Sequence, residues 1–431
     1  MREMKDSGIE WIGIIPKGWN ISRLKYIAKF FNGDRGKNYP SSEDLVDDGI
    51  AFLTSNNIHG IVLDCSQEKS KFITEERYNR LGGAKIQLND IAFCLRGSVG
   101  NCAINKTLTK GTVASSLMII RPIKASSDFI NYVLQTDVCD VQTIKAMNGS
   151  CAANLSAENV SNYYFVEPPI VEQKKIAIFL DSKCSEIDAI SADIQKEIEI
   201  LEQYKRSVIT EAVTKGLNPD AEMKDSGVAW CPQIPSHWQY SNPKGLFGLR
   251  TDRAFRDDRQ LTASQEYGIV YQDEYMEKTG NKVVTVTKDF SILKHVEPDD
   301  FVISMRSFQG GLEYSDKRGC ISSAYVMLIP NKEFVYAPFY RWFFKSSKYI
   351  NALQSTSNLV RDGQAMRYAN FVKVPLFIVP IEEQKAIASY LDEKIEKVNS
   401  ILAEKKKQLE ILSNYKKSLI YEYVTGKKEA T

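Results

Sequence analysis

The sequence predicts an α+β protein in which one plan occurs twice, a mixed α/β globule followed by a long helix. The first observation is a repeat: Pro169–Thr214 recurs without a gap as Pro380–Thr425, an offset of 211 residues (380 − 169). The second is that residues 5–19 recur as residues 224–238, with eight of fifteen positions identical. The third is that short apolar runs bounded by Gly, Asn, Asp and Ser fill the stretch between the repeats, which is typical of strands.

Length and composition limit the class of protein. A chain of 431 residues is expected to hold two to four domains. Its formal net charge is only +2, so a nucleic-acid site would have to be a local concentration of Lys and Arg. The eight cysteines are scattered without a Cys-x-x-Cys pair, which favours reduced thiols in a cytoplasmic protein. The sequence has no apolar signal core and no 18-residue apolar run, so we expect neither a secreted nor a membrane protein.

Each half begins with a tryptophan-containing segment that cannot be helical. In the first copy Gly8 and Pro16 break any helix, and Trp11 and Trp19 flank the proline. Trp230 and Trp238 of the second copy hold the equivalent positions. We interpret these tryptophans as anchors that pack an extended segment on the domain, in preference to surfaces for base stacking.

The stretch from Ile21 to Glu167 predicts a sheet core with long loops. Strands are expected at Ile50–Leu53, Ile91–Leu95 and Leu117–Ile120, and a helix with an acidic first turn at Asp128–Gln135. Loops rich in hydroxyl, amide and Arg side chains hold equivalent places in the two halves: Leu95–Gly100 and Met305–Gly311, Gly111–Leu117 and Gly319–Tyr325, and Asn148–Ser156 and Ser357–Arg367. The halves therefore share a scaffold and differ in a surface carried on loops.

The repeated helical segments predict a coiled coil. Apolar residues recur at threes and fours along both copies, and Glu172 and Glu383 stand in first turns, where a carboxylate is favoured. A helix over Ala189–Val213 would be roughly 37 Å long. Such a helix needs a partner, and we expect it to be the other copy; the alternative is packing on its own domain. The predicted pairing residues are Ile187, Ile190, Ile194, Leu201, Tyr204, Val208, Val398, Ile401, Leu409, Leu412, Tyr415 and Leu419.

These patterns divide the chain into four parts. They are a first variable domain (residues 1–167), a central helical segment (residues 168–216), a second variable domain (residues 217–379) and a C-terminal helical segment (residues 380–431).

No motif in the sequence indicates catalysis. A phosphate-binding loop and an Asn/Asp-Pro-Pro-Tyr methyltransferase tetrapeptide are both missing. Pro219–Lys224 superficially resembles the carboxylate–lysine pattern of nucleases, but it follows a helix stop. Three histidines leave little for a Ser/His/Asp arrangement. We therefore expect a binding protein with no catalytic residue, no metal site and no cofactor.

The paired motifs resemble those of one family. Both halves combine a KDSG-x-x-W…IP-x-x-W segment with a P-I-x-EQ-x-x-IA-x-x-L helix and a YK-x-S-x-I-x-E-x-V-T helix end. This is similar to the DNA-specificity subunit of type I restriction-modification systems, over essentially the whole chain. The resemblance implies two target-recognition domains separated by two long helices that form an antiparallel coiled coil with pseudo-two-fold symmetry. Each domain would read one half of a bipartite, asymmetric target in double-stranded DNA, so helix length would set the gap between half-sites.

The resemblance also implies partners. Two methyltransferase subunits and restriction (motor-nuclease) subunits would supply catalysis, so S-adenosylmethionine, Mg and ATP are expected only in the partners. Base reading needs Arg, Asn, Gln, Ser or Thr, and phosphate contact needs Lys or Arg. The candidate DNA-binding residues are Arg96, Ser98, Asn101, Lys106, Lys110 and Ser115 in the first domain, and Arg306, Ser307, Gln309, Arg318, Ser322, Arg361 and Arg367 in the second.

Two other readings and one weaker patch stay open at this level. The chain could be an enzyme with a cryptic nuclease or methyltransferase site, or a helical protein scaffold without DNA readout. Arg250, Arg253, Arg256 and Arg259 could face phosphates, but Asp252, Asp257 and Asp258 dilute their charge.

Overall fold

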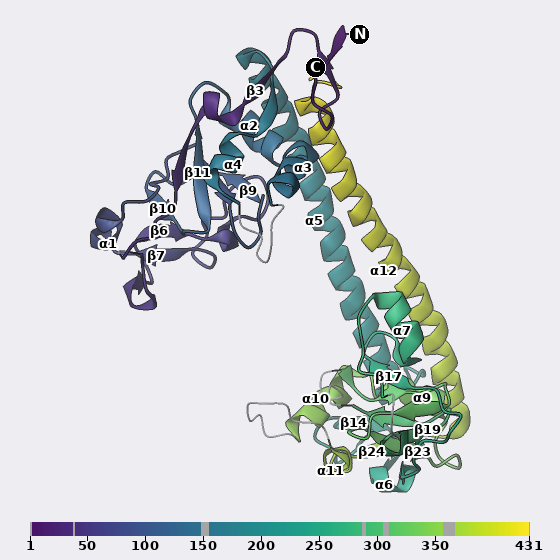
Figure 1. Cartoon of the computed structure of the whole chain (residues 1–431). Helices are drawn as coiled ribbons and strands as arrows, with labels where there is room; N and C mark the ends of the chain where they lie inside the picture. Colours follow the sequence, from purple (N-terminus) through teal and green to yellow (C-terminus); the bar gives the residue numbers. More distant parts are fainter. Residues whose placement is uncertain are drawn as a thin grey trace. The chain divides into compact units, whose positions relative to one another are not determined.

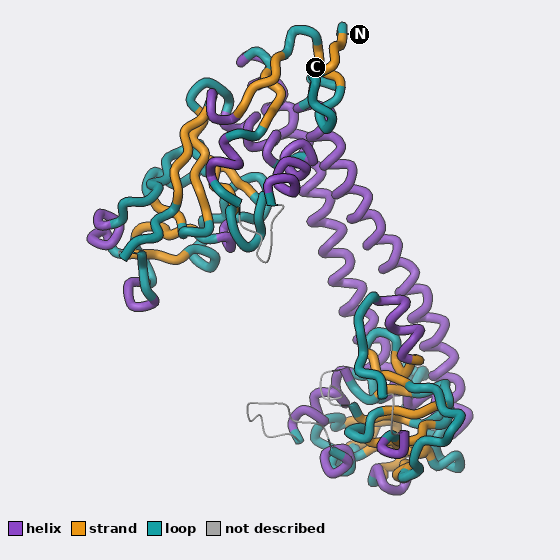
Figure 2. Tube along the Cα trace, viewed as in Figure 1, coloured by secondary structure: helices purple, strands orange, loops and turns teal. Residues whose placement is uncertain are grey.

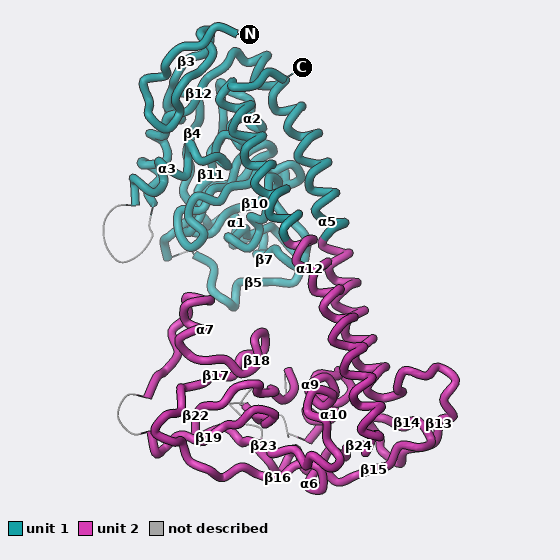
Figure 3. Tube along the Cα trace, turned by 90° about the vertical axis from the view of Figure 1, so that its right-hand side faces the viewer, with its two compact units in different colours: residues 1–194, 407–431 teal, residues 195–406 magenta. Residues whose placement is uncertain are grey.

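A computed structural model describes residues 2–37, 39–147, 155–286, 290–304, 310–356 and 367–430. The chain forms two compact units, which are coloured separately in Figure 3. Unit 1 consists of residues 1–194 and 407–431, and unit 2 of residues 195–406. The predicted α+β class is confirmed, because each unit combines short strands with helices (Figure 2).

Unit 1 is built on two four-stranded sheets. The central sheet is antiparallel, in the order β4 (Ala28–Asn32), β11 (Leu117–Pro122), β8 (Ile91–Cys94) and β9 (Cys102–Ile104). The second runs β10 (Gly111–Val113), β6 (Ile50–Leu53), β7 (Lys71–Ile73) and β5 (Leu45–Val46), with β10 parallel to β6. Strands β8 and β9 are buried along their whole length, which explains their continuous apolar sequences.

Two strand pairs and several short helices complete unit 1. Strand β1 (Met4–Asp6) pairs with β2 (Ile14–Pro16), and β3 (Asn20–Arg23) pairs with β12 (Tyr164–Glu167). The helices are α1 (Glu75–Arg80), α2 (Ser127–Leu134), α3 (Asp137–Ala146) and α4 (Ala157–Ser161), and 3-10 turns cover Leu24–Tyr26, Ser42–Asp44 and Ser55–Asn57. The expected strands at 50–53, 91–95 and 117–120 and the helix at 128–135 are thus confirmed to within a few residues.

Unit 2 repeats the central sheet with shorter strands. Its four-stranded sheet has the order β16 (Phe247–Arg250), β23 (Val326–Pro330), β20 (Phe301–Ile303) and β21 (Glu313–Tyr314). The strand pairs are β13 (Met223–Asp225) with β14 (Gln233–Pro235), β15 (Gln239–Ser241) with β24 (Leu376–Ile378), β17 (Leu261–Ser264) with β18 (Gly268–Tyr271), and β19 (Lys294–Val296) with β22 (Gly319–Ile321). Its short helices are α6 (Pro243–Leu246), α7 (Gln272–Thr279), α9 (Ala337–Phe343), α10 (Ser347–Ser355) and α11 (Tyr368–Phe371), with a 3-10 turn at Phe290–Ile292.

The two repeated segments form the longest helices of the chain, α5 (Ile170–Lys215) and α12 (Ile381–Val424) (Figure 1). Each is a single helix, with 46 residues in α5 and 44 in α12. Buried and half-buried positions follow one another at alternating threes and fours along both, as in a coiled coil. On α5 they are Cys184, Ile187, Ser191, Ile194, Ile198, Leu201, Lys205 and Val208; on α12 they are Leu391, Ile395, Val398, Leu402, Lys405, Leu409, Leu412, Lys416, Leu419 and Tyr423.

Contacts between α5 and α12 give their direction in each unit. In unit 1, Phe179 stacks on Tyr423 with ring centroids 4.4 Å apart, and Lys416 Nζ lies 2.6 Å from Asp188 Oδ1. In unit 2, Lys205 donates to Asn399 Oδ1 at 2.7 Å, and Lys405 pairs with Glu197 at 2.6 Å. In both units the α12 number falls as the α5 number rises, so the helices run antiparallel. The Lys416–Asp188 and Lys205–Asn399 contacts also correspond through the offset of 211 residues, because 188 + 211 = 399 and 205 + 211 = 416.

Four of the predicted pairing residues lie outside the buried stripe. Ile190 is 50% exposed, Tyr204 42%, Ile401 44% and Tyr415 55%. Each of the four stands one position before a buried or half-buried residue of the stripe, so its side chain flanks the seam and does not fill it. The sequence prediction was wrong in placing these side chains inside the seam, because apolar character alone does not separate a seam position from its neighbour.

The repeated Glu-Gln pair fixes each helix to its own domain. The Trp19 indole N–H donates to Glu172 at 2.8 Å, and the Trp238 indole N–H donates to Glu383 at 3.0 Å. The following glutamine, Gln173, accepts from the Ser126 backbone N–H and donates to the Pro168 carbonyl, both at 2.9 Å. Trp19 and Trp238 are almost fully buried, so their predicted anchoring role is confirmed.

Three properties of the described residues bear on class. None of the described helices combines the length and apolarity needed to cross a membrane. The seven cysteines within the described residues are free thiols, and burial raises the pKa of the Cys94 thiol to about 11. Within the same residues, no group of three or more His, Cys, Asp or Glu side chains is arranged to hold a metal ion.

Candidate nucleic-acid interface

One end of the central sheet of unit 1 brings several predicted residues together. The loop between β8 and β9 carries Arg96, Ser98 and Asn101, and all three side chains are exposed. Ser115 follows β10, and the neighbouring Ser116 carbonyl accepts from the Leu95 backbone N–H at 2.8 Å. Four of the six candidates in the first domain therefore lie at the same end of the sheet.

A groove of about 580 Å³ opens at this end of unit 1. Arg96 lines it together with Arg35, which reaches Ser115 from the loop after β4 and donates to its carbonyl at 3.5 Å. Apart from Leu155, the rest of the lining is small or polar: Asn32, Gly33, Asp34, Gly82, Gly83, Ser156, Ala157 and Asn159. Arg35 was missed by the sequence reading, because only the pairing of β4 with β11 carries its loop to Ser115.

Close backbone contacts shape the floor of the groove. A Cβ atom on Gly33 would lie 2.1 Å from the Ala114 carbonyl oxygen, and one on Gly83 would lie 2.3 Å from the Asp34 backbone nitrogen. Any side chain at these two positions would have to displace the backbone opposite. The loops that carry Arg35 and Ser115 are thus held in a fixed arrangement by glycines.

The charged groups of the groove differ in whether they have hydrogen-bond partners. The Asp34 carboxylate accepts from the backbone N–H groups of Gly36 and Gly82, each at 2.9 Å, and the Gly36 bond is the main cause of a pKa below the usual value for Asp34. Among the described residues, none forms a hydrogen bond or ion pair with the Arg96 side chain. The groove therefore presents two guanidinium groups without a carboxylate partner and one carboxylate already held by the backbone.

The two predicted lysines of the first domain lie elsewhere. Lys106 follows the far end of β9, where it pairs with Asp128 at 2.6 Å and donates to Asn89 at 3.1 Å. Lys110 precedes β10, whereas Ser115 follows it, and Lys110 pairs with Glu75. The structure does not bring either lysine to the Arg96 groove, and both charges are offset by carboxylates.

In unit 2 two of the candidate residues flank β22 at its opposite ends. Arg318 lies before β22 and faces Asp257 at 3.2 Å, Asp258 at 3.8 Å and Glu297 at 3.7 Å, whereas Ser322 is exposed beyond the other end of that strand. Arg367 is exposed at the start of α11. The remaining candidates of this domain lie outside the described residues: Arg306, Ser307, Gln309 and Arg361.

Strand register identifies the counterpart of the unit 1 groove. Cys94 pairs with Leu117 in unit 1, and the equivalent strands pair Ile303 with Val326, so the chain after Ser304 corresponds to the Arg96 loop. Here Lys294 Nζ donates to the Tyr325 carbonyl at 2.6 Å, as Arg35 does to Ser115. The pKa of Lys294 is lowered mainly by burial and to a smaller extent by the positive charge of Arg253. The sequence reading missed Lys294, which no motif marks.

Two of the four arginines near residue 250 pair with carboxylates. Arg250 pairs with Asp300 at 2.6 Å and with Asp252 at 3.1 Å, and Arg259 pairs with Asp273 at 2.8 Å. The expected dilution by acidic neighbours is therefore seen at Arg250.

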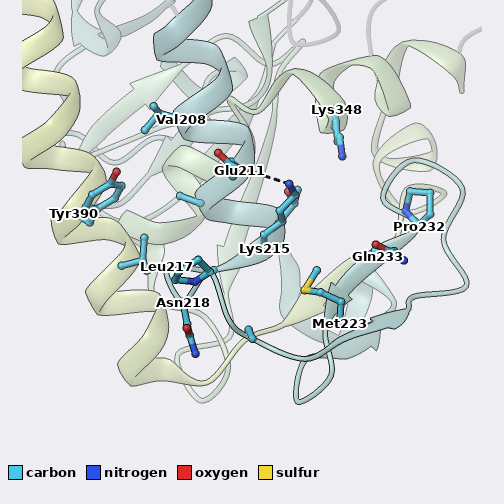
Figure 4. Close-up of a pocket in the computed structure, with 15 residues that line it drawn as sticks. Val208, Glu211, Lys215, Leu217, Asn218, Met223, Pro232, Gln233, Lys348 and Tyr390 are labelled. Carbon is cyan, nitrogen blue, oxygen red and sulfur yellow. Dashed lines mark hydrogen bonds and ion pairs between the residues drawn. The ribbon is translucent and has the colours of Figure 1, made fainter.

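A pocket of about 1070 Å³ lies in unit 2, at the end of α5 (Figure 4). Glu211 and Lys215 pair at 3.1 Å across one turn of α5, and Lys348 reaches toward the same space from α10. The nuclease-like stretch Pro219–Lys224 runs along this pocket, but the Asp220 and Glu222 side chains are exposed. Nothing about these carboxylates indicates a catalytic pair.

Comparison with known proteins gives consistent matches. The family described as "Type I restriction modification DNA specificity domain" matches residues 16–200 and 235–411. The provisionally assigned MjaX type I restriction enzyme specificity subunit of Methanocaldococcus jannaschii is 23% identical over 96% of this chain and 95% of its own length. The MjaVIII specificity subunit of the same organism is 21% identical over 96% of this chain and 93% of that protein.

A solved structure has a similar fold. It is described as "Structural basis underlying complex assembly and conformational transition of the type I R-M system", and it matches with a TM-score of 0.68 at 14% identity. The match covers 96% of this chain and 99% of that chain.

Proposed function

The chain belongs to the family of type I restriction-modification DNA specificity subunits, and we propose that it reads a bipartite DNA target with one half-site for each unit. The observation that carries the proposal is duplication with divergence. Both units keep the Trp–Glu bond that fixes the domain to its helix, whereas polar side chains at equivalent places differ. Lys110 precedes β10 and pairs with Glu75 in unit 1, but Arg318 precedes the equivalent strand β22 and faces Asp257 in unit 2. Two scaffolds that share a frame and differ in their polar loops suit an asymmetric target.

The chain itself supplies recognition and no catalysis. The described residues that line the pocket at the end of α5 and the unit 1 groove include no His and no Cys. Methyl transfer from S-adenosylmethionine, and cleavage driven by ATP and Mg, would belong to methyltransferase and restriction subunits. A protein with this role works in the cytoplasm, where its DNA is.

Two matched surface patches favour two copies of one methyltransferase partner. In unit 1, Ile190 of α5 and Tyr415 of α12 are about half exposed and flank the seam; in unit 2, Tyr204 and Ile401 do the same. The residues correspond through the repeat offset: 190 + 211 = 401 and 204 + 211 = 415. Half-exposed Ile and Tyr at equal positions give two similar apolar surfaces, which one kind of partner could bind twice.

The recognition test uses the complex with its cognate methyltransferase subunits. A methylated-base map of a genome in which the complex is expressed should give one two-part motif with a fixed gap, and the purified chain alone should transfer no methyl groups and cut no DNA. Methylation of one contiguous motif, methylation without sequence preference, or activity of the chain alone would contradict the proposal.

The partner test uses Ile190→Glu and Ile401→Glu. Each should reduce the number of bound methyltransferase subunits from two to one in native mass spectrometry, because a charge is placed in one apolar patch. Ile123→Glu is the matched control, since Ile123 is 52% exposed and lies after β11, away from both long helices. Two bound copies in both patch variants would show that the partner docks elsewhere.

A further inference from the structure

The arginines of the unit 1 groove differ from other arginines of that unit because they have no carboxylate partner among the described residues. Arg77 pairs with Asp44, and Arg121 pairs with Asp90. Arg96 has no partner among the described residues, and Arg35 makes one long bond to a carbonyl. Two guanidinium groups that line one groove without a carboxylate partner are available to a ligand rich in hydrogen-bond acceptors.

Asp34 narrows the chemistry of that ligand. Its carboxylate lines the same groove and accepts from the Gly36 and Gly82 backbone N–H groups at 2.9 Å, while the backbone N–H groups of Arg35 and Gly83 also interact with it. A carboxylate oxygen has capacity for a second donor. Phosphate oxygens only accept hydrogen bonds, so a phosphate would satisfy the arginines but would be repelled by Asp34. The groove therefore suits a ligand that presents acceptors beside a donor.

The major-groove edge of a G·C base pair has this pattern. Guanine offers O6 and N7 as acceptors, and the cytosine N4 amino group is a donor. An A·T pair keeps the N7 acceptor but places the adenine N6 donor where guanine has O6, and it places the thymine O4 acceptor where Asp34 needs a donor. The close backbone contacts at Gly33 and Gly83 fix the floor, so the arginines project from loops that need little ordering on binding.

We propose that this groove reads one G·C base pair of the half-site bound by unit 1. Arg96 and Arg35 donate to guanine O6 and N7, and Asp34 accepts from cytosine N4. The inference rests on the proposed function, because it assumes that unit 1 binds a DNA half-site, and it adds the residues and the base pair.

The test compares four variants in the complex with methyltransferase subunits: Arg96→Lys, Arg96→Ala, Arg35→Ala and the control Lys124→Ala. Lys124 is exposed beyond the opposite end of β11, so the control removes one positive charge outside the groove. The side chains of Arg96 and Arg35 are exposed, so their replacement leaves the core intact. After the wild-type motif is mapped, binding is measured to targets with each base pair substituted in turn.

The proposal expects one position of one half-site to require G·C in the wild type. Arg96→Lys keeps the charge but loses the planar fork, so discrimination at that position should fall roughly 10- to 100-fold while the other half-site is read as before. Replacing that guanine by 7-deazaguanine should weaken the wild type and leave Arg96→Ala little changed. Lys124→Ala should match the wild type in every comparison.

Three results would overturn this assignment. One is unchanged discrimination in all groove variants. The second is uniform weakening on all sequences with a smaller salt dependence, which is the behaviour of a phosphate contact. The third is equal sensitivity of wild type and Arg96→Ala to 7-deazaguanine. A wild-type complex without any sequence preference would instead contradict the proposed function, so the two failures are distinguishable.

Discussion

The buried carboxylate of Asp90 gives a sharp test of what holds unit 1 together. The Asp90 side chain is 2% exposed, and it receives both Arg121 Nε and Arg121 Nη2 at 2.7 Å. The Gln87 backbone N–H donates to the same carboxylate at 2.7 Å. Arg121→Met keeps much of the side-chain volume on β11 but removes two of these three donors.

The expected cost is large because the remaining charge stays buried. Removing one partner of a buried ion pair typically costs about 3–5 kcal/mol, against a total of about 5–15 kcal/mol for a domain. A loss of about 4 kcal/mol corresponds to roughly 1000-fold faster hydrogen exchange for amides that exchange through unfolding of the unit. The double variant Asp90→Asn/Arg121→Met should recover most of this loss, because it removes the unpaired charge.

Hydrogen exchange read by mass spectrometry suits this test because it reports on each unit separately. Peptides from β8 and β11 should lose protection in Arg121→Met, whereas peptides from β16 and β20 should not. Arg250→Met should have the opposite pattern, since Arg250 pairs with the buried Asp300 of unit 2. Arg80→Met removes an exposed pair and serves as the control. Protection of β8 within tenfold of the wild type would refute the assignment of a structural role to the ion pair.

Two further predictions concern buried charges in unit 2. Burial lowers the pKa of Lys205 below its ordinary 10.5, so the unfolded chain binds that proton more tightly than the folded chain. The free energy of unfolding should therefore rise as pH approaches 10.5. Lys205→Met should remove this rise and should protect α5 peptides from hydrogen exchange at pH 7 by about 1–2 kcal/mol. Burial raises the pKa of Glu313 above 4.5, so the folded unit binds that proton more tightly than the unfolded chain. The free energy of unfolding should therefore fall as pH rises from 4.5 through the pKa of the folded unit, and Glu313→Gln should flatten this fall in urea titrations. Wild-type slopes in either variant would contradict these expectations.

The shared scaffold of the two halves could be predicted because its sequence motifs occur twice in the chain. Glu172 and Glu383 recur in the same spacing, and the structure gives them one role, as acceptors for the Trp19 and Trp238 indoles. Repetition separates such positions from ordinary surface charges. Strand and helix positions in the first domain followed equally well, since buried runs such as Ile91–Cys94 are apolar throughout.

The candidate site was predicted only in part, because it is assembled across strands. Arg96 stood out through its glycine-rich loop, but Arg35 reaches the same groove by the pairing of β4 with β11, which no local pattern records. Lys106 and Lys110 have the right chemistry, yet their strands end at other edges, beside Asp128 and Glu75. Residue type indicates what a side chain can bind, whereas register decides which side chains meet.

The composition of the two cores has a consequence for the order of events on the ribosome. The unit 1 core includes Leu419, Ile420 and Val424 from the end of α12, so it combines segments that precede unit 2 with one that follows it. Unit 2 is continuous from residue 195 to 406, and its core draws on no later segment. During translation the second unit can complete its core first, and the first unit must wait with an apolar surface uncovered until α12 emerges.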